Sequence, residues 1–478
     1  MRILFAATEA APFFKTGGLG DVAGALPKEL ARKGEDVRVV LPLWKNMKEQ
    51  YKEQLADALS FDVYVGYRRQ YCGIKTVKMD GVQYYFIDNM YYFDRDGLYG
   101  YFDDGERFAF FQMAIIEMME KVNFIPDVLH VNDYHTAFIP FLLKEKYRWI
   151  QAFKDIRTVL TIHNMQFQGI YEKAVLWDLY GVGAERFDDG TLVWDGRLNT
   201  MKAGVLYADR VTTVSKSYAQ EIQRQAFGEG LDQVLRMENG KLSGILNGID
   251  YDMNDPEKDP LIEHHFSIAD LSPKALNKAD IQKHFGLPVK KEIPLIAMVS
   301  RLTLQKGFHL ILQELSRILE KDVQVVLLGT GFDKQLEDDF RSFGEQYPEK
   351  MGVSISFDVK LAQLMYAGSD LFLMPSAFEP CGLSQMISMR YGTLPIVHEI
   401  GGLKDTVIPY NKNTGEGTGF GFSEFTGLQL ANAVFKAIEL YENDKKAWKK
   451  LQVNAMQRDF SWETSSERYL LLYKGLFG

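Results

Sequence analysis

Short apolar runs alternate with longer segments of helical periodicity along almost the whole chain. The first half carries such runs at residues 3–7, 37–41, 84–87, 128–131, 158–162 and 210–214, and the second half at 295–299, 323–328, 353–357, 371–374 and 394–397. Helical patterns, such as those at 22–33, 106–121, 308–319 and 361–367, lie between them. Alternation of this kind predicts parallel sheets connected by right-handed crossovers, and therefore an α/β fold.

The length of the chain predicts more than one domain. It has 478 residues, whereas a single hydrophobic core stops growing at roughly 250–300 residues. The segment Asn247–Phe266 is rich in Gly, Pro, Asp and Asn and has weak periodicity, which is typical of a hinge or linker. We therefore expect an N-terminal domain over residues 1–246, a C-terminal domain over 247–456, and a final helix over 457–478.

Charge and cysteine content exclude several classes of protein. The net charge of 55 − 64 = −9 argues against nucleic acid or an anionic membrane as the main partner, because both select a basic surface. The two cysteines, Cys72 and Cys381, lie far apart, so neither a disulfide framework nor a CxxC metal site is predicted. The chain contains no run of 18 apolar residues and begins without the pattern of a signal peptide. A cytoplasmic location is the expectation.

The segment FFKTGGLGDV, Phe13–Val22, has the composition of an anion-binding loop. Gly18-Leu-Gly20-Asp-Val-Ala23 fits a dinucleotide fingerprint. However, it begins about ten residues after the first apolar run, and the next run ends at Pro42 rather than at an acidic residue. Glycines allow close approach of a ligand, the following helix offers free N–H groups, and Lys15 adds a positive charge. A glycine turn required only for packing remains the alternative.

A second cationic segment follows the apolar run at 295–299. Arg301 stands at its end and Lys306 precedes a helical pattern. Ligands of open α/β sheets bind beyond the carboxyl ends of the strands, so this pair suits a diphosphate. Glu379 follows another apolar run and could accept hydrogen bonds from sugar hydroxyls. The neighbouring Cys381 is interpreted as a small apolar filler rather than a nucleophile.

Seven motifs occur in one order along the chain: KTGGLGDV (15–22), HVNDYH (130–135), TIHN (161–164), NGID (247–250), SRLTLQKG (300–307), FEPCGLSQ (378–385) and GGLKDTV (401–407). In these motifs the chain resembles bacterial glycogen synthase and plant starch synthase. The resemblance implies two Rossmann-like domains that face a deep interdomain cleft (the GT-B fold). The N-terminal domain would lie on the glucan acceptor side and the C-terminal domain on the nucleotide-sugar donor side, with the final helix packing back on the N-terminal domain.

The resemblance also implies residue roles. Four residues are predicted to be catalytic: His163, Arg301, Lys306 and Glu379. The predicted donor-binding residues are Lys15, Gly17, Gly18, Asp21, Asn247, Cys381, Gly382 and Leu383. The predicted acceptor-binding residues are Glu9, Asp133, Asn164 and Tyr99. In one departure from related transferases, Ile387 stands where a second glutamate is common, which leaves Gln385 as the candidate to hold the ribose.

The function implied is transfer of glucose from ADP-glucose to the non-reducing end of an α-1,4-glucan, with retention of configuration, which extends glycogen. No cofactor and no metal are expected, because Arg301 and Lys306 can stabilise the leaving phosphate and neither Asp94-Arg-Asp96 nor Asp250-Tyr-Asp252 ends a convincing buried strand. The alternatives are a retaining transferase that acts on a small acceptor, and an inactive glucan-binding protein. The expected partners are ADP-glucose and a glucan primer, with no nucleic acid and no membrane; no oligomeric state is predicted.

The segment Tyr84–Phe111 is unusually rich in aromatic residues. Aromatic faces suit the apolar faces of glucose rings. The hypothesis is that some of Tyr91, Tyr92, Tyr99 and Tyr101 line an acceptor groove, while part of the segment is core.

Overall fold

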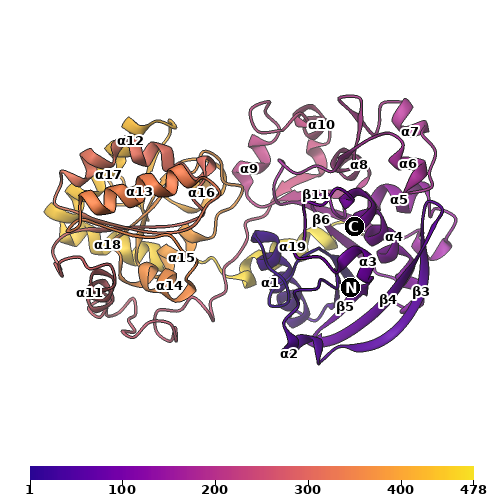
Figure 1. Cartoon of the computed structure of the whole chain (residues 1–478), viewed down its shortest axis with the longest axis horizontal. Coiled ribbons are helices and arrows are strands. Elements are labelled where there is room, and N and C mark those ends of the chain that lie inside the picture. The colour runs from indigo at the N-terminus through magenta and orange to yellow at the C-terminus, as the bar shows by residue number, and fades with distance from the viewer. The chain divides into compact units, whose positions relative to one another are not determined.

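The computed structural model describes residues 1–478 and divides into two compact units. The first contains Met1–Asn247 together with Trp462–Gly478, and the second contains Gly248–Ser461. Figure 1 shows the elements of both units. No helix combines the length and apolar character needed to cross a membrane.

The first unit is built on a nine-stranded sheet with the order β12-β11-β7-β6-β1-β2-β5-β4-β3. All neighbours are parallel from β12 to β5, and β4 and β3 are added as antiparallel strands. The strands are β1 (Arg2–Ala6), β2 (Asp36–Pro42), β3 (Ala56–Val65), β4 (Arg68–Met79), β5 (Val82–Asp88), β6 (Val128–Asn132), β7 (Arg157–Ile162), β11 (Arg210–Thr213) and β12 (Leu242–Gly244). The central strands are almost fully buried, as expected for a parallel sheet covered on both faces.

The remaining elements of the first unit surround this sheet. Its helices are α1 (Gly18–Arg32), α2 (Glu49–Lys52), α3 (Met90–Phe93), α4 (Asp104–Lys121), α5 (Ile139–Glu145), α6 (Val175–Asp178), α7 (Glu185–Asp188), α8 (Thr200–Tyr207), α9 (Lys216–Glu221), α10 (Asp232–Met237), α19 (Trp462–Lys474), and the 3-10 turns η1 (Gln151–Phe153) and η2 (Asn239–Lys241). A small antiparallel sheet is formed by β8 (Ile170–Tyr171), β10 (Arg197–Asn199) and β9 (Val193–Trp194).

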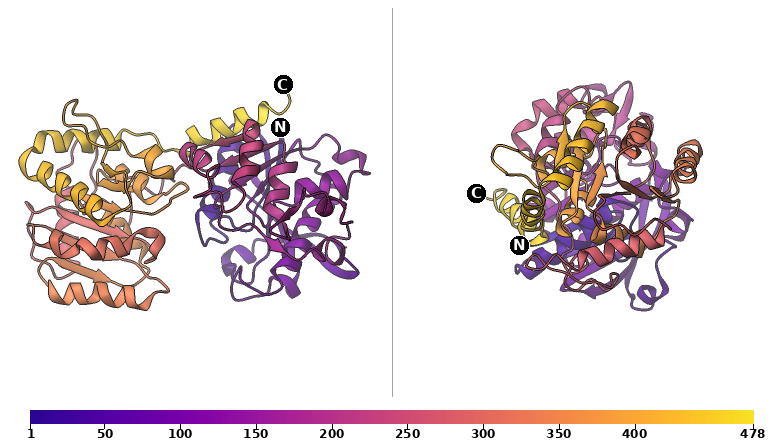
Figure 2. Two further views of the ribbon diagram at one scale, coloured as in Figure 1. Left: turned by 90° about the horizontal axis from the view of Figure 1, so that it is seen from above. Right: turned by 90° about the vertical axis from the view of Figure 1, so that its left-hand side faces the viewer.

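The last helix, α19, belongs to the first unit although it follows the second in sequence. It packs against α1, and in Figure 2 it is the yellow helix near the N-terminus. The Tyr473 hydroxyl lies 2.6 Å from Nδ1 of His130, and both side chains are fully buried. The Ser465 hydroxyl donates to the carbonyl of Leu246 at 2.7 Å. Polar bonds as well as apolar packing therefore fix this helix.

The second unit contains a six-stranded, entirely parallel sheet with the order β15-β14-β13-β16-β17-β18. Its strands are β13 (Leu295–Val299), β14 (Gln324–Leu328), β15 (Met351–Ser354), β16 (Leu371–Met374), β17 (Leu394–His398) and β18 (Phe420–Phe422). Its helices are α11 (Lys274–His284), η3 (Leu304–Lys306), α12 (Phe308–Leu319), α13 (Lys334–Gln346), α14 (Val359–Gly368), α15 (Ser384–Arg390), α16 (Gly401–Thr406), α17 (Gly427–Asn443) and α18 (Lys445–Met456).

Three features differ from the sequence expectation. The run at 353–357 predicts a strand, but β15 ends at Ser354 because its partner strand β14 ends at the paired Leu328. Asp358 then caps the next helix, accepting a hydrogen bond from the N–H of Leu361. Helix α1 begins at Gly18 rather than at residue 22, so part of the glycine segment is its first turn. The antiparallel pair β3 and β4 was not predicted.

Candidate functional site

The glycine segment connects β1 to α1, at the carboxyl end of the central strand. Glu9 holds its first residues in place. One carboxylate oxygen, Oε2, accepts the backbone N–H groups of Thr16 at 2.6 Å and Gly17 at 3.3 Å. The other, Oε1, accepts the hydroxyls of Thr16 at 2.6 Å and Tyr99 at 2.7 Å. Both oxygens of Glu9 are thus bound to the chain itself, and its predicted contact with the acceptor stays a prediction.

Lys15 stands immediately before this anchored turn. Its ammonium lies 2.6 Å from Oδ1 of Asp21, in the first turn of α1, and about half of the side chain is exposed. A Cβ atom added at Gly17 or Gly18 would meet no atom within 4 Å, so the space beside both glycines is open. Four of the predicted donor-binding residues, Lys15, Gly17, Gly18 and Asp21, therefore lie together at an accessible helix N-terminus, where free N–H groups and the helix dipole favour an anion.

Asp133 and His163 follow the neighbouring strands β6 and β7. Asp133 adopts a left-handed backbone conformation, with φ of 55°, and its Oδ1 accepts the N–H of His163 at 2.7 Å. Burial raises the pKa of Asp133 to about 7, while hydrogen bonds from the backbone of His163 and Asn164 act in the opposite direction. Burial lowers the pKa of His163 to about 3, so its ring is neutral.

The ring of His163 is also fixed. Its Nε2 lies 2.9 Å from Oδ1 of Asn132, the last residue of β6. Asn164, the other residue predicted on the acceptor side, accepts the N–H of Gln166 through its side chain at 3.0 Å.

The aromatic segment only partly agrees with the groove hypothesis. Tyr92 is fully buried and donates to Glu106 at 2.7 Å, so it cannot contact a glucan. Tyr99 is partly exposed; its ring stacks on His135 with 4.7 Å between the centroids, and its pKa is raised well above the ordinary value by burial. Tyr91 is 63% exposed and Tyr101 is half-buried. Tyr91, Tyr99 and Tyr101 remain candidates for sugar contacts.

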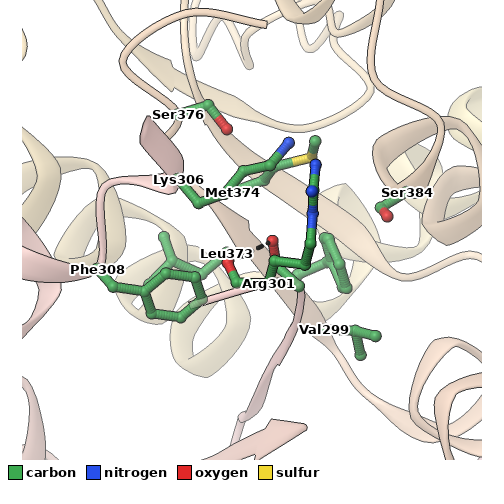
Figure 3. Close-up of a pocket in the computed structure, with 10 residues that line it drawn as sticks. Val299, Arg301, Lys306, Phe308, Leu373, Met374, Ser376 and Ser384 are labelled. Atoms are coloured by element: carbon green, nitrogen blue, oxygen red, sulfur yellow. Dashed lines mark hydrogen bonds between the residues drawn. The ribbon is translucent and has the colours of Figure 1, made fainter. Parts of the chain in front are cut away.

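The second unit contains a cavity of about 180 Å³ at the carboxyl ends of β13 and β16. Arg301 and Lys306 line it, and in Figure 3 both side chains extend toward the same region beside Met374. The other lining residues are Val299, Ser300, Phe308, Phe372, Leu373, Met374, Ser376 and Ser384. Arg301 is exposed and forms no ion pair within the chain, so its guanidinium is available to an anionic ligand.

Lys306 is paired with Glu379. Its ammonium lies 2.7 Å from Oε2 of Glu379, and the same oxygen accepts the hydroxyl of Ser376 at 2.9 Å. Gly307 makes this arrangement possible: its φ is +78°, and a Cβ there would lie 2.1 Å from the carbonyl oxygen of Pro375. The close approach of these two loops places three of the predicted catalytic residues, Arg301, Lys306 and Glu379, in one unit.

The segment after Glu379 leads into α15. Gly382 has a φ of +74°, Leu383 is the N-terminal cap residue of α15, and Cys381 is buried. Gln385 was the candidate to hold the ribose, and this was wrong: it is fully buried, and its amide donates to the carbonyls of residues 381 and 382 and to the hydroxyl of residue 406. Asn247, the last residue of the first segment, is 4% exposed, and its Oδ1 has no partner.

Several residues that sequence reasoning missed support the site. Thr16 bridges the glycine turn to Glu9, Ser376 shares the carboxylate of Glu379 with Lys306, and Asn132 orients His163. Phe357, at the end of an apolar run that predicts a strand, lies in the loop after β15. It is 88% exposed at the carboxyl end of the same parallel sheet that carries Arg301 and Lys306. Thr16, Ser376 and Asn132 adjoin or lie within recognised motifs. Thr16 and Ser376 bond carboxylates only seven and three positions away, whereas Asn132 lies 31 positions from His163.

Comparison with known proteins agrees with this geometry. Residues 2–237 match the family described as starch synthase catalytic domain, and residues 280–455 match glycosyl transferases group 1. The chain is 60% identical to the glycogen synthase of Ligilactobacillus salivarius over 477 residues and 59% identical to that of Streptococcus sanguinis over 476 residues, with 100% of each chain covered. The chain belongs to the glycogen and starch synthase family.

Solved structures agree with the assignment. The catalytic domain of starch synthase IV from Arabidopsis thaliana, solved with ADP and acarbose, superposes with a TM-score of 0.91 at 32% identity and covers 99% of both chains. Sucrose-phosphate synthase from Thermosynechococcus elongatus, at 18% identity and a TM-score of 0.61 over 99% of this chain and 98% of that one, shares the fold alone. The predicted fold class, two Rossmann-like α/β domains of a GT-B glycosyltransferase, is therefore confirmed, as is the family resemblance.

Proposed function

We propose that the chain is a retaining glucosyltransferase that moves glucose from ADP-glucose to the non-reducing end of an α-1,4-glucan and so extends glycogen. The observation that carries the proposal is the cavity of the second unit, where an unpaired Arg301 and a Lys306 held beside Glu379 line one small space. Family membership supplies the substrate class. The starch synthase with bound ADP, a nucleotide, and acarbose, an oligosaccharide, supports both the proposed donor and the proposed acceptor.

The chemistry explains why cations stand here. Cleavage of the bond between C1 and the phosphate oxygen places negative charge on the departing diphosphate and positive charge on the sugar ring. Fixed positive side chains stabilise that developing charge more than they stabilise the ground state. Arg301 suits a bidentate contact with phosphate oxygens and Lys306 acts as a point charge. Neither contact requires a metal ion.

Glu379 plays two parts in this proposal. Its carboxylate holds Lys306 at 2.7 Å, which orients the ammonium, and its remaining oxygen offers an acceptor for a sugar hydroxyl. The segment 381–383 adds backbone N–H groups for the donor. Phe357 offers an exposed aromatic face at the same edge of the sheet, where the flat adenine base can stack.

Residues of the first unit complete the proposed machinery. Lys15, Gly17, Gly18 and Asp21 contribute to donor binding at the start of α1, and Asn247 is a further donor-binding residue. His163 contacts the transferred sugar. Asp133, Asn164, Tyr99 and Glu9 shape the acceptor side, where Glu9 also orders the turn that carries Lys15.

Initial rates with ADP-glucose and UDP-glucose on a glycogen primer test the proposal. We expect glucan growth with ADP-glucose, and a lower kcat/KM with UDP-glucose. Formation of a disaccharide or another small glucoside in place of longer glucan would favour a transferase with a small acceptor. Binding of glycogen without turnover of either donor would favour an inactive glucan-binding protein.

A further inference from the structure

Asn132 ends β6 at the point where the parallel strand β1 also ends. In the register of the two strands, Ala6 of β1 pairs with Val131, so Asn132 lies one residue beyond the last pair. Its amide nitrogen Nδ2 donates to the carbonyl oxygen of Ala6 at 3.0 Å, and the side chain is fully buried. If the amide were turned over, its Oδ1 would face the carbonyl oxygen of Ala6, and two acceptors would meet. The contact with Ala6 therefore assigns the positions of Nδ2 and Oδ1.

The other end of that amide faces His163. Oδ1 of Asn132 lies 2.9 Å from Nε2 of the imidazole. A carbonyl oxygen only accepts hydrogen bonds, so Nε2 of His163 must carry the proton. Because burial lowers the pKa of His163 to about 3, the ring holds a single proton at neutral pH, and Nδ1 is left with a free lone pair.

The backbone that carries the ring is also held in place. The backbone N–H of His163 donates to Asp133 at 2.7 Å, directly after β7. Nδ1 forms no hydrogen bond within the chain, and it is not among the buried polar atoms without a partner. It therefore reaches the accessible side of the residue as an acceptor.

We infer that Asn132 is a positioning residue that sets His163 in the Nε2-protonated tautomer, so that His163 meets the sugar as a neutral hydrogen-bond acceptor through Nδ1. In this role His163 accepts a hydrogen bond from a hydroxyl group of the glucose and transfers no proton. An imidazolium would add a second positive charge beside a sugar ring that is itself becoming positive, and the fixed neutral tautomer avoids that repulsion. The kinetic consequence of this inference rests on the proposed function, whereas the tautomer itself does not.

Nuclear magnetic resonance of the ligand-free protein tests the tautomer directly. The chain has eight histidines, so long-range proton–nitrogen spectra of protein with nitrogen-15 in histidine are tractable, and loss of one set of signals in His163→Gln assigns His163. At neutral pH we expect a protonated Nε2 and an unprotonated Nδ1. A protonated Nδ1, or a ring protonated at both nitrogens, would overturn the inference whatever reaction the enzyme catalyses.

Two substitutions at Asn132 complete the test. Asn132→Leu removes the acceptor, and a population with protonated Nδ1 should appear. Asn132→Asp keeps an oxygen facing Nε2, and its buried carboxyl should stay protonated so that the second oxygen donates to the carbonyl of Ala6. This variant should retain the protonated Nε2, and a protonated Nδ1 in it would refute the inference even if the leucine variant does not fold. Asn89→Leu is the matched control: Asn89 is also buried and also uses both ends of its amide, bonding residues 71 and 92, but it does not touch His163. An unchanged spectrum in Asn132→Leu would refute the role of Asn132.

Kinetics provide the second readout. Asn132→Leu should lower kcat with ADP-glucose about tenfold, the loss expected for one misdirected hydrogen bond, and leave the Kd for ADP unchanged because ADP lacks the transferred glucose. Equal losses in Asn132→Leu and Asn89→Leu would mean that Asn132 acts through stability alone, against the inference. If no variant and no wild-type protein turned over ADP-glucose, the proposed function would fail, while the spectra would still decide the tautomer.

Discussion

Lys306 is the residue whose removal best separates catalysis from stability. In Lys306→Gln the carboxylate of Glu379 keeps the hydroxyl of Ser376 but loses its ammonium partner at 2.7 Å. Only 16% of the Lys306 side chain and 9% of the Glu379 side chain are exposed. The substitution therefore leaves a largely buried negative charge without compensation and removes a positive charge from the cavity.

The two consequences have different magnitudes. Breaking a buried ion pair by removing one partner costs about 3–5 kcal/mol, and the partial exposure of this pair and the hydroxyl of Ser376 place the expected cost near the lower end, about 3 kcal/mol. Loss of one preorganised group that stabilises transition-state charge costs about 2.7–4 kcal/mol, or about 10²–10³-fold in kcat. Lys306→Gln should therefore be both less stable and much slower.

A double variant separates the two effects. Lys306→Gln combined with Glu379→Gln removes both charges, so most of the lost stability should return, whereas kcat should stay low. Lys278→Gln is the control, because Lys278 forms a buried pair with Asp370 at 2.7 Å in the same unit but does not line the cavity. It should lose comparable stability and keep its turnover per folded molecule.

Calorimetry gives the stability of each variant and initial rates with ADP-glucose give kcat. Recovery of near-normal kcat in the double variant would refute the reasoning, because it would show that Lys306 serves only to neutralise Glu379. A wild-type kcat in Lys306→Gln would also refute the reasoning.

Further predictions concern the packing and titration of the first unit and the donor base. Tyr473→Phe leaves Nδ1 of buried His130 without its partner and should cost about 1–3 kcal/mol in urea denaturation, with unchanged stability as the contrary result. Burial lowers the pKa of His130 and His135 to about 3 from an ordinary 6.5, so the unfolded chain binds more protons between these values, and stability should fall as pH drops below about 6.5, by about 1.4 kcal/mol per pH unit for each histidine. His135→Phe should show a shallower fall in urea denaturation followed by tryptophan fluorescence; an identical pH dependence would contradict this. Phe357→Ala should raise the KM for ADP-glucose several-fold with little effect on kcat, and an unchanged KM would remove the stacking role.

Much of the fold could be predicted from the sequence because parallel strands buried on both faces appear as continuous apolar runs. Such runs predicted β1, β2, β6 and β7 within one or two residues. The strands β3 and β4 could not be predicted in this way because many of their residues are exposed or half-buried, so they form no continuous apolar run. The end of β15 could not be predicted because it is set by the length of its partner β14, which ends at Leu328 opposite Ser354, while the apolar run continues to Phe357.

The site was predicted less completely for a different reason. Motifs located Lys15, His163, Lys306 and Glu379, but the bonds that orient them join residues far apart in the chain. Glu9 meets Tyr99 across 90 positions, His163 meets Asn132 across 31, and Lys306 meets Glu379 across 73. A single sequence contains no signal for such pairs; only the pairing order of the strands brings them together.

The product of the reaction tests the central claim most directly. Glycogen should be extended with ADP-glucose carrying labelled glucose and then digested with β-amylase, which removes maltose from the non-reducing ends of α-1,4-linked chains. The proposed activity predicts that the incorporated label is released as maltose. Two results would contradict transfer with retention to the end of a glucan. One is label in glycogen that β-amylase does not release, and the other is a small labelled glucoside with no label in glycogen.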